Sequence, residues 1–315
     1  MRNRITVITG QTATGKTQAA VKLAQNTNGA LINFDARQIY QRQDIVPGKD
    51  VFNGSNYKLV RTKQGYQIGY YLIDNIPVWL YDIISTDISF SAFTYAELSL
   101  EIIKELLDSR HHVIIVGGTY YYLYHLLYQL PQHPAPDISL RNHLQKKTIQ
   151  ELQQMVHHLD PELYHSLNQS ERHNPQRLMR KIEILKHAGS EVKLSQQHKY
   201  DTNLSYKINK DIELEIQGYL YEDKELLREA ITKRVVQRLS AGAIEETQNL
   251  MKLGFTLDDP GMQAIGYKQI TSYLNNTMTY EDMKDEWITK EVQYGKRQLT
   301  FMKKDPNITW RPVDR

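Results

Sequence analysis

The chain has 315 residues, of which 40% are hydrophobic and 24% are charged, and its formal net charge is +3. This composition is typical of a folded globular protein and argues against disorder, and the length allows a full core with a second, smaller unit. A charge of +3 does not by itself predict a nucleic-acid partner. The chain has no cysteine, which excludes disulfides, thiolate zinc sites and a thiol nucleophile.

The sequence gives no sign of a membrane protein. No window approaches the roughly 18 consecutive apolar residues that a spanning helix requires. Residues Met1–Arg4 include two arginines, but the apolar run that follows stops at Thr9 and Gly10, so we do not expect a signal sequence. Together with the missing cysteines, this predicts a cytoplasmic enzyme without membrane association.

Strands and helices alternate in the first part of the chain. The runs Ile5–Ile8 and Ala30–Phe34 predict strands, and Gln18–Gln25 between them has helical character. A helix is expected over Tyr95–Leu107, and a strand that is buried on both faces over Val113–Val116. This order predicts an α/β fold, in which a parallel sheet has helices on each side.

A β-hairpin insertion in the core is expected at about residues 51–76. The segments Tyr57–Val60 and Tyr66–Tyr70 flank Lys63–Gly65, which ends in a glycine suited to a turn. Further along the chain, three prolines between Pro131 and Pro136 indicate a domain boundary.

Most of the chain after this boundary is expected to be helical. Asn174–Pro175 is typical of a helix start, and Gly189 of the matching stop. Residues 135–199 hold ten Lys and Arg against seven Asp and Glu, with seven of the 11 histidines. Ile212–Tyr219 predicts a strand that returns to the first domain, and Trp310 is expected in a short tail after further helices. 

These elements predict two domains. Residues 1–134 and 200–315 are expected to form the catalytic core, and residues 135–199 a mostly helical insertion. The basic surplus of the insertion is explained equally well by a solvated helical surface and by an anionic partner.

A phosphate-binding loop follows the first predicted strand directly. The segment Gly10-Gln11-Thr12-Ala13-Thr14-Gly15-Lys16-Thr17 matches G-x-x-x-x-G-K-[ST] at each fixed position. The glycines let successive N–H groups point at phosphate oxygens, and the following helix adds its positive N-terminus. Lys16 supplies a charge for the outer phosphate, and the Thr17 hydroxyl is placed for a bridging Mg²⁺ ion. The sequence therefore predicts a P-loop NTPase-like core that handles a di- or triphosphate.

The acid that such a core uses lies in an unusual place. Motor and switch ATPases usually have a carboxylate at the end of a second hydrophobic strand, but Val113–Val116 continues into Gly117-Gly118-Thr119. Instead, Asp35 closes the strand after the loop. An aspartate there is most often a cap or turn residue, but it could also take a proton from an acceptor while the loop holds a phosphate donor. This arrangement is typical of a transferase.

Six segments together resemble the motif set of the bacterial tRNA dimethylallyltransferases. In the order of that family they are the phosphate loop, Asp35–Tyr40, Val116–Thr119, Gln176–Arg180, Gln263–Lys268 and Gln293–Thr300. The resemblance implies that a dimethylallyl group moves from dimethylallyl diphosphate to N6 of the adenosine just 3′ of the anticodon, at position 37 of the tRNA.

The resemblance also implies roles for single residues. Asp35 matches the general base, Lys16 acts in catalysis as well as in binding, and Thr119 and Arg141 match residues that touch the reacting nucleotide. The phosphate loop and Arg234 match the donor diphosphate site, and Thr17 the Mg²⁺ ligand. The residues expected to contact tRNA are Asp35, Ala36, Arg37, Gln38, Thr119, Arg141, Gln176, Arg177, Leu178, Met179, Arg180, Gln263, Ala264, Ile265, Gly266, Tyr267 and Lys268.

Three features depart from the family's pattern. Ala36 replaces the usual serine after the aspartate, and Pro47-Gly48-Lys49 stands where the family usually has glycine-threonine-alanine-lysine. The predicted hairpin is longer than the usual linker. None of these changes affects Lys16, Thr17 or Asp35.

Three other classes of protein remain as alternatives. An adenylate isopentenyltransferase would share the loop and the aspartate but prenylate a free nucleotide, and a P-loop small-molecule kinase would bind ATP. A non-enzymatic RNA-binding protein fits least, because Lys16, Thr17 and Asp35 are all intact. The insertion and the basic C-terminal helix favour a tRNA anticodon stem-loop as the partner, bound by a monomer.

Overall fold

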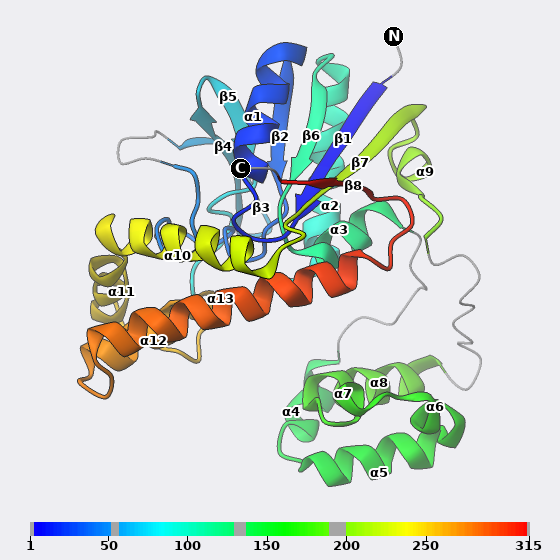
Figure 1. Ribbon diagram of the computed structural model, residues 1–315. Coiled ribbons are helices and arrows are strands. Elements are labelled where there is room, and N and C mark those ends of the chain that lie inside the picture. Colours follow the sequence, from blue (N-terminus) through cyan, green and yellow to red (C-terminus); the bar gives the residue numbers. More distant parts are fainter. Residues whose placement is uncertain (1–2, 52–56, 129–136, 189–199, 314–315) are drawn as a thin grey trace. The chain divides into compact units, whose positions relative to one another are not determined.

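The structure, a computed structural model, describes residues 3–51, 57–128, 137–188 and 200–313. The chain divides into two compact units (Figure 1): the first unit is Met1–Tyr128 with Tyr200–Arg315, and the second unit is Gln129–Lys199. The boundary expected near residue 134 and the helix stop expected at Gly189 lie outside the described residues.

The first unit is built on an eight-stranded sheet with the order β3-β4-β5-β2-β6-β1-β7-β8. The strands are β1 (Asn3–Gly10), β2 (Gly29–Asn33), β3 (Lys58–Lys63), β4 (Tyr66–Ile73), β5 (Ile76–Trp79), β6 (His112–Val116), β7 (Ile212–Leu220) and β8 (Thr309–Pro312). Only the β3–β4 and β4–β5 pairs are antiparallel. The mostly parallel sheet confirms the predicted α/β class.

Helices cover both faces of this sheet because alternate strand residues point to opposite sides. Leu31 packs with residues of α1 (Lys16–Thr27), whereas its neighbour Ile32 packs with residues of α2 (Ala92–Asp108) and α3 (Tyr120–Leu127). Both neighbouring central strands, β2 and β6, are buried along their whole length. Such strands read as continuous apolar runs, which is how they were predicted.

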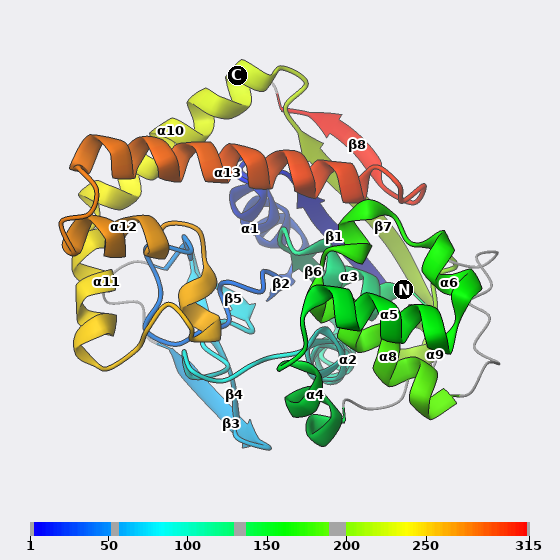
Figure 2. The ribbon, with the colours of Figure 1, turned by 90° about the horizontal axis from the view of Figure 1, so that it is seen from below.

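A group of helices forms a second layer of core in the first unit. It comprises α10 (Lys224–Ser240), α11 (Ala243–Lys252), the 3-10 turn Pro260–Gln263, α12 (Tyr267–Leu274) and α13 (Tyr280–Met302). Figures 1 and 2 show these helices side by side at one end of the sheet, and Trp287 is fully buried at their centre. A short helix, α9 (Leu204–Ile208), packs against α2.

Two expectations about this unit are corrected. The predicted hairpin exists as β3 and β4, with positive φ at Gln64 and Gly65 as a type I′ turn requires. However, it continues into β5, which pairs with β2, so it is an edge of the main sheet and not a separate insertion. Trp310 lies in strand β8 beside β7, and not in a tail, because its backbone extends the sheet.

The second unit is helical, with α4 (Ile138–Leu144), α5 (Ile149–Leu159), α6 (Pro161–Ser166), α7 (Gln169–Arg172) and α8 (Pro175–Ala188). Its core contains Leu152, Leu178 and Ile182. The predicted start of α8 is confirmed, because the Arg177 backbone N–H donates to Asn174 Oδ1 at 3.0 Å. No described helix of either unit is long and apolar enough to cross a membrane.

Candidate active site at the carboxyl edge of the sheet

The phosphate loop is shaped by two glycines that no other residue could replace without strain. Gly10 ends β1 with φ 131°, and a Cβ atom there would lie 2.0 Å from the Tyr219 carbonyl oxygen. Gly15, with φ 73°, is the N-cap of α1. The loop therefore enters the helix in the geometry that aims backbone N–H groups at an anion.

Side chains from distant elements hold this loop in place. Gln298 of α13 accepts from the Thr12 N–H at 2.9 Å and donates to the Gly118 carbonyl at 2.9 Å. Tyr221 donates its backbone N–H to Gln11 Oε1 at 2.8 Å and its hydroxyl to the Ala13 carbonyl at 3.0 Å. The loop is thus fixed before any ligand contacts it, which favours tight recognition. Sequence reasoning gave neither Gln298 nor Tyr221 a role.

Lys16 is half-buried and donates from Nζ to the Gln11 carbonyl. Burial, and then the positive charge of Arg234, lower its pKa from 10.5 to about 7, although Asp35 and Asp50 act in the opposite direction. An anionic ligand beside Lys16 would stabilise its protonated form and so raise its pKa again.

Two arginines of α10 lie beside the loop. Arg234 donates from Nη1 to Thr12 Oγ1 at 2.9 Å and from Nη2 to the Gly48 carbonyl at 3.4 Å. Arg238 is buried against Glu291 at 3.0 Å, and burial followed by the charge of Arg234 lowers its pKa to about 10. The two neighbouring guanidinium groups favour the binding of an anion at this wall of the site.

Asp35 is placed by the ends of β2 and β6. Its backbone N–H donates to Asn33 Oδ1 at 3.0 Å, and its Oδ1 accepts from the Arg37 N–H at 3.0 Å. Thr119 Oγ1 accepts from the Ala36 N–H at 3.0 Å, which ties this turn to the end of β6. The carboxylate is therefore held by the backbone at the edge where the parallel strands end, the usual place for sites in α/β proteins.

These groups surround one cavity of about 980 Å³. Of the residues predicted from the sequence, the cavity is lined by Thr12, Ala13, Thr14, Gly15, Lys16, Thr17, Asp35, Arg37, Gln38, Arg234, Gln263, Ala264 and Ile265. Gly10, Gln11, Ala36 and Thr119 support this wall from outside it. Tyr294 and Arg297 of α13 also line the cavity, and neither is among the site residues predicted from the sequence.

Three residues expected to contact tRNA are core residues instead. Tyr267 is fully buried and donates to Glu246 at 2.8 Å. Gly266 has φ 113°, and a Cβ atom there would lie 2.7 Å from Trp287. Leu178 is fully buried in the core of the second unit. Their places in the motifs reflect packing, whereas Lys268 is exposed.

The remaining predicted residues belong to the second unit. Gln176 and Arg177 are exposed, and Met179 is half-buried. Arg141 and Arg180 both donate to the carboxylate of Glu183, which is fully buried, at 3.1 Å from Arg141 Nη2 and 2.8 Å from Arg180 Nη1. Both arginines therefore neutralise a buried acid.

Two cavity residues could hold a magnesium ion together with a bound ligand. Within the described residues, no group of three or more His, Cys, Asp or Glu side chains could hold a metal. Mg²⁺, however, usually takes one or two protein oxygens and completes its shell with phosphate and water. Thr17 and Asp50 supply such oxygens to the cavity.

Comparison with known proteins agrees with this geometry. A family model described as isopentenyl transferase matches residues 3–62, and one described as IPP transferase matches residues 72–305. A tRNA dimethylallyltransferase of Endomicrobium trichonymphae is 30% identical over 304 residues, which cover 96% of this chain and 93% of that protein. One of Bacillus cereus is 31% identical over 317 residues, which cover 99% and 90%.

Solved structures give the same result. The tRNA isopentenylpyrophosphate transferase of Bacillus halodurans aligns with a TM-score of 0.64 and 25% identity, over 99% of this chain and 90% of that one. A eukaryotic dimethylallyltransferase described as acting on tRNA shares the fold, with a TM-score of 0.72 and 20% identity over 99% and 74%. The resemblance read from the six segments is confirmed, and the chain belongs to the IPP transferase family.

Proposed function

We propose that this protein is a tRNA dimethylallyltransferase, which moves a dimethylallyl group from dimethylallyl diphosphate to N6 of the adenosine at position 37. One observation carries the proposal: the phosphate loop, at the end of β1, and Asp35, at the end of β2, line the same cavity. One group binds a phosphate donor, the other accepts a proton, and the family's curated relatives bear this enzyme's name.

The donor side stabilises the leaving diphosphate. As the bond between the allylic carbon and the diphosphate oxygen breaks, negative charge grows on the leaving group. Lys16, Arg234 and the N–H groups at the start of α1 are fixed around that position, so they stabilise the transition state more than the ground state.

The acceptor side supplies the base. The N6 amine is a poor nucleophile because its lone pair is delocalised into the ring, and Asp35 accepts its proton as the new C–N bond forms. The products are the prenylated adenosine and diphosphate. The reacting base must leave the stack of the anticodon loop to reach the cavity, at a cost of a few kcal/mol that other RNA contacts offset.

Mg²⁺ is the expected cofactor. Thr17 and Asp50, which both line the cavity, would hold it, and the ion would supply positive charge that stabilises the leaving diphosphate. EDTA should therefore stop the reaction, and added Mg²⁺ should restore it. Full activity in EDTA would remove Mg²⁺ from the mechanism.

The exposed residues of α8 and the basic residues of α13 support a tRNA substrate that is recognised through its folded anticodon stem-loop. We infer that the protein works as a monomer in the cytoplasm, a reducing compartment that the absence of cysteine suits. Sedimentation of the purified protein, alone and with one stem-loop per chain, tests whether the protein is a monomer.

The choice of acceptor is the direct test of the function. Labelled dimethylallyl diphosphate is supplied with either AMP or an anticodon stem-loop that has adenosine at position 37, and kcat/KM is compared. We expect the stem-loop to be preferred by orders of magnitude, and a stem-loop with guanosine there to be inert because it has no N6 amine. Equal use of AMP would identify an adenylate isopentenyltransferase. Transfer of phosphate from ATP, without prenylation, would identify a kinase.

A further inference from the structure

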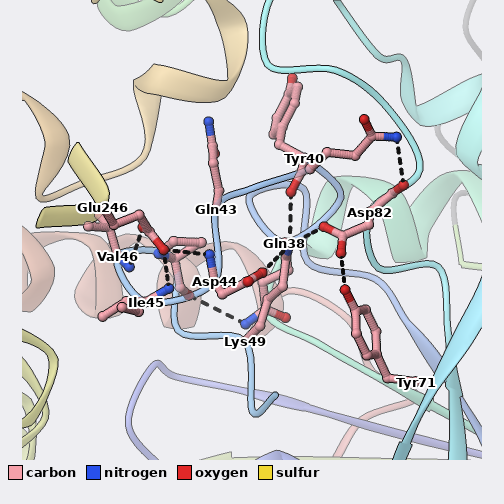
Figure 3. Close-up of polar contacts among 12 residues, drawn as sticks. Gln38, Tyr40, Gln43, Asp44, Ile45, Val46, Lys49, Tyr71, Asp82 and Glu246 are labelled. Carbon is pink, nitrogen blue, oxygen red and sulfur yellow. Dashed lines mark hydrogen bonds and ion pairs between the residues drawn. The ribbon is translucent and has the colours of Figure 1, made fainter. Parts of the chain in front are cut away.

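Residues Asp44–Asp50, which we call the anchored loop, form part of the cavity wall through Val46, Pro47 and Asp50. The loop is held from behind by two charged side chains and carries, on its front, two carbonyl groups that meet cavity residues. Figure 3 shows the contacts behind the loop. None of these contacts is used in the mechanism above.

The first support is Glu246 of α11. Its carboxylate accepts three consecutive backbone N–H groups, from Asp44 and Ile45 at 2.7 Å each and from Val46 at 3.0 Å. The Tyr267 hydroxyl donates to the same carboxylate at 2.8 Å. A carboxylate bound by three backbone donors fixes both the position and the direction of that backbone.

The second support is Lys49, whose side chain is fully buried. Its ammonium group donates to the Tyr40 carbonyl at 2.8 Å, to Asp44 Oδ1 at 2.9 Å and to the carboxylate of Asp82. The other oxygen of Asp82 accepts from the Tyr71 hydroxyl. All three donors of the ammonium group are satisfied, as a buried charge requires.

The front of the loop meets the arginines. The Gly48 carbonyl accepts from Gln38 Nε2 at 2.8 Å and from Arg234 Nη2 at 3.4 Å, and the Pro47 carbonyl accepts from Arg238 Nη2 at 3.4 Å. The other end of the Arg234 guanidinium reaches Thr12 of the phosphate loop. Arg234 is therefore held between the two loops.

There is no free space between Gly48 and the arginines. Gly48 has φ 67°, and a Cβ atom there would lie 2.7 Å from Arg234 Nη2 and 2.3 Å from Arg238 Nη2. Two neighbouring guanidinium groups repel each other, and an arginine stem has many rotamers. Carbonyl oxygens at fixed points both reduce the repulsion and select one arrangement.

We propose that Glu246 and Lys49 are positioning residues of the diphosphate site. By holding the anchored loop from behind, they fix the Gly48 carbonyl that directs Arg234 toward the phosphate loop. The proposal rests on the proposed function for the identity of the ligand, so inorganic diphosphate, bound in the presence of Mg²⁺, is the probe. Its affinity is measured by titration calorimetry and does not require prenyl transfer.

The first experiment compares two glycine substitutions. Gly48→Ala and Gly65→Ala both place a side chain at positive φ, but nothing lies within 4 Å of a Cβ atom at Gly65, in the β3–β4 turn. Only Gly48→Ala should push Arg234 away, and we expect it to weaken diphosphate binding by about tenfold or more, with Gly65→Ala within about twofold of the parent. Equal affinities of the two variants would overturn the role of the anchored loop.

The second experiment is a double-mutant cycle. Glu246→Gln removes the charge and leaves a single acceptor oxygen, and Glu245→Gln, an exposed neighbour on α11, is the matched control. We expect Glu246→Gln to weaken diphosphate binding about tenfold in the parent but less than about twofold when Arg234 is already alanine. If Glu246 only stabilised the fold, Glu246→Gln would lower the affinity for diphosphate by the same factor in both backgrounds. That result would overturn the proposal.

Lys49→Met is tested in the same two backgrounds, after a thermal melt has shown that it folds. If the parent protein binds diphosphate and shows this coupling but prenylates no RNA, the proposed function fails and the positioning role stands. If the parent prenylates the stem-loop but the cycle is additive, the positioning role fails alone.

Discussion

At the scale of single residues, the surroundings of Lys16 strongly affect its protonation. Its pKa of about 7 lies below its ordinary value of 10.5, first because it is buried and then because Arg234 is near. The unfolded chain thus binds this proton more tightly, so the lysine's contribution to the free energy of unfolding rises with pH between about 7 and 10.5.

Because of this pKa, the affinity for diphosphate should depend on pH. Above about pH 7 most of Lys16 is neutral, and it must take up a proton when an anion binds. Affinity should therefore fall as the pH rises through 7 to 9. Calorimetry at pH 8, in two buffers of different ionisation enthalpy, should show that the parent takes up more protons per diphosphate than Lys16→Met, which should also bind more weakly. Equal proton uptake by the two proteins would place the proton elsewhere.

Two substitutions of Asp35 distinguish a general base from a residue that only shapes the turn. Asp35→Ala should lower kcat by about 10²–10⁴-fold, the range for a general base, with diphosphate affinity nearly unchanged. Asp35→Asn retains the acceptor for the Arg37 N–H but cannot take the proton, so it should be as inactive as the alanine variant. Activity retained by asparagine in single-turnover assays would show that the residue only shapes the turn.

At the scale of elements, helix α8 presents a testable RNA surface. Arg177 is exposed at its start, and Lys186 is exposed nine residues later, which is two and a half turns and hence the opposite side of the helix. We expect Arg177→Ala to raise the KM for tRNA and to reduce the slope of log affinity against log salt by about one. Lys186→Ala should leave the slope unchanged; equal effects would mean that the helix contributes only general charge.

The elements that the sequence predicted are those with a strong local pattern. The apolar runs that became β1, β2 and β6 are buried on both faces, so their sequence alone indicates them. Strands β5 and β8 have four residues each, contain Pro77 and Pro312, and exist because they pair with β2 and β7. Such short strands depend on partners that are distant in the sequence.

The residues of the candidate site also divide into those that a local sequence pattern predicts and those that it does not. The phosphate loop has its own spacing, and Asp35 was found because it closes a strand. Gln298 was not given a role, since it is one polar residue among many on a long helix and its partner Thr12 is 286 positions away. Tyr267 and Leu178 show the converse error: a motif includes residues that pack as well as residues that contact substrate.

At the scale of the whole molecule, the two core residues that flank the second unit in the sequence lie close together. Tyr128 and Tyr200, the last and first residues of the core segments, have ring centroids 5.8 Å apart. Core groups hold this junction: Asp305 accepts from the Tyr128 hydroxyl at 2.6 Å, and Lys207 donates to the Tyr128 carbonyl at 2.8 Å. Contacts among described core residues thus hold the two ends together.

Replacing residues 129–199 with a short glycine-serine linker should therefore leave a folded core. We expect its affinity for diphosphate to stay within about twofold of the full chain, while prenylation of the stem-loop is lost or needs far more RNA. Thermal melts and calorimetry measure the first outcome, and kinetics the second. Loss of the diphosphate site together with the second unit would show that the two fold as one.

The bond between Gln298 and the phosphate loop also sets an order of events during synthesis. The loop is among the first segments to leave the ribosome, but its neighbours arrive late: β6 after about a third of the chain, β7 after two thirds, and Gln298 with β8 only near the end. A nascent chain can thus hold a complete loop sequence and still have no formed diphosphate site. We therefore expect truncated products that end before residue 298 to bind diphosphate weakly.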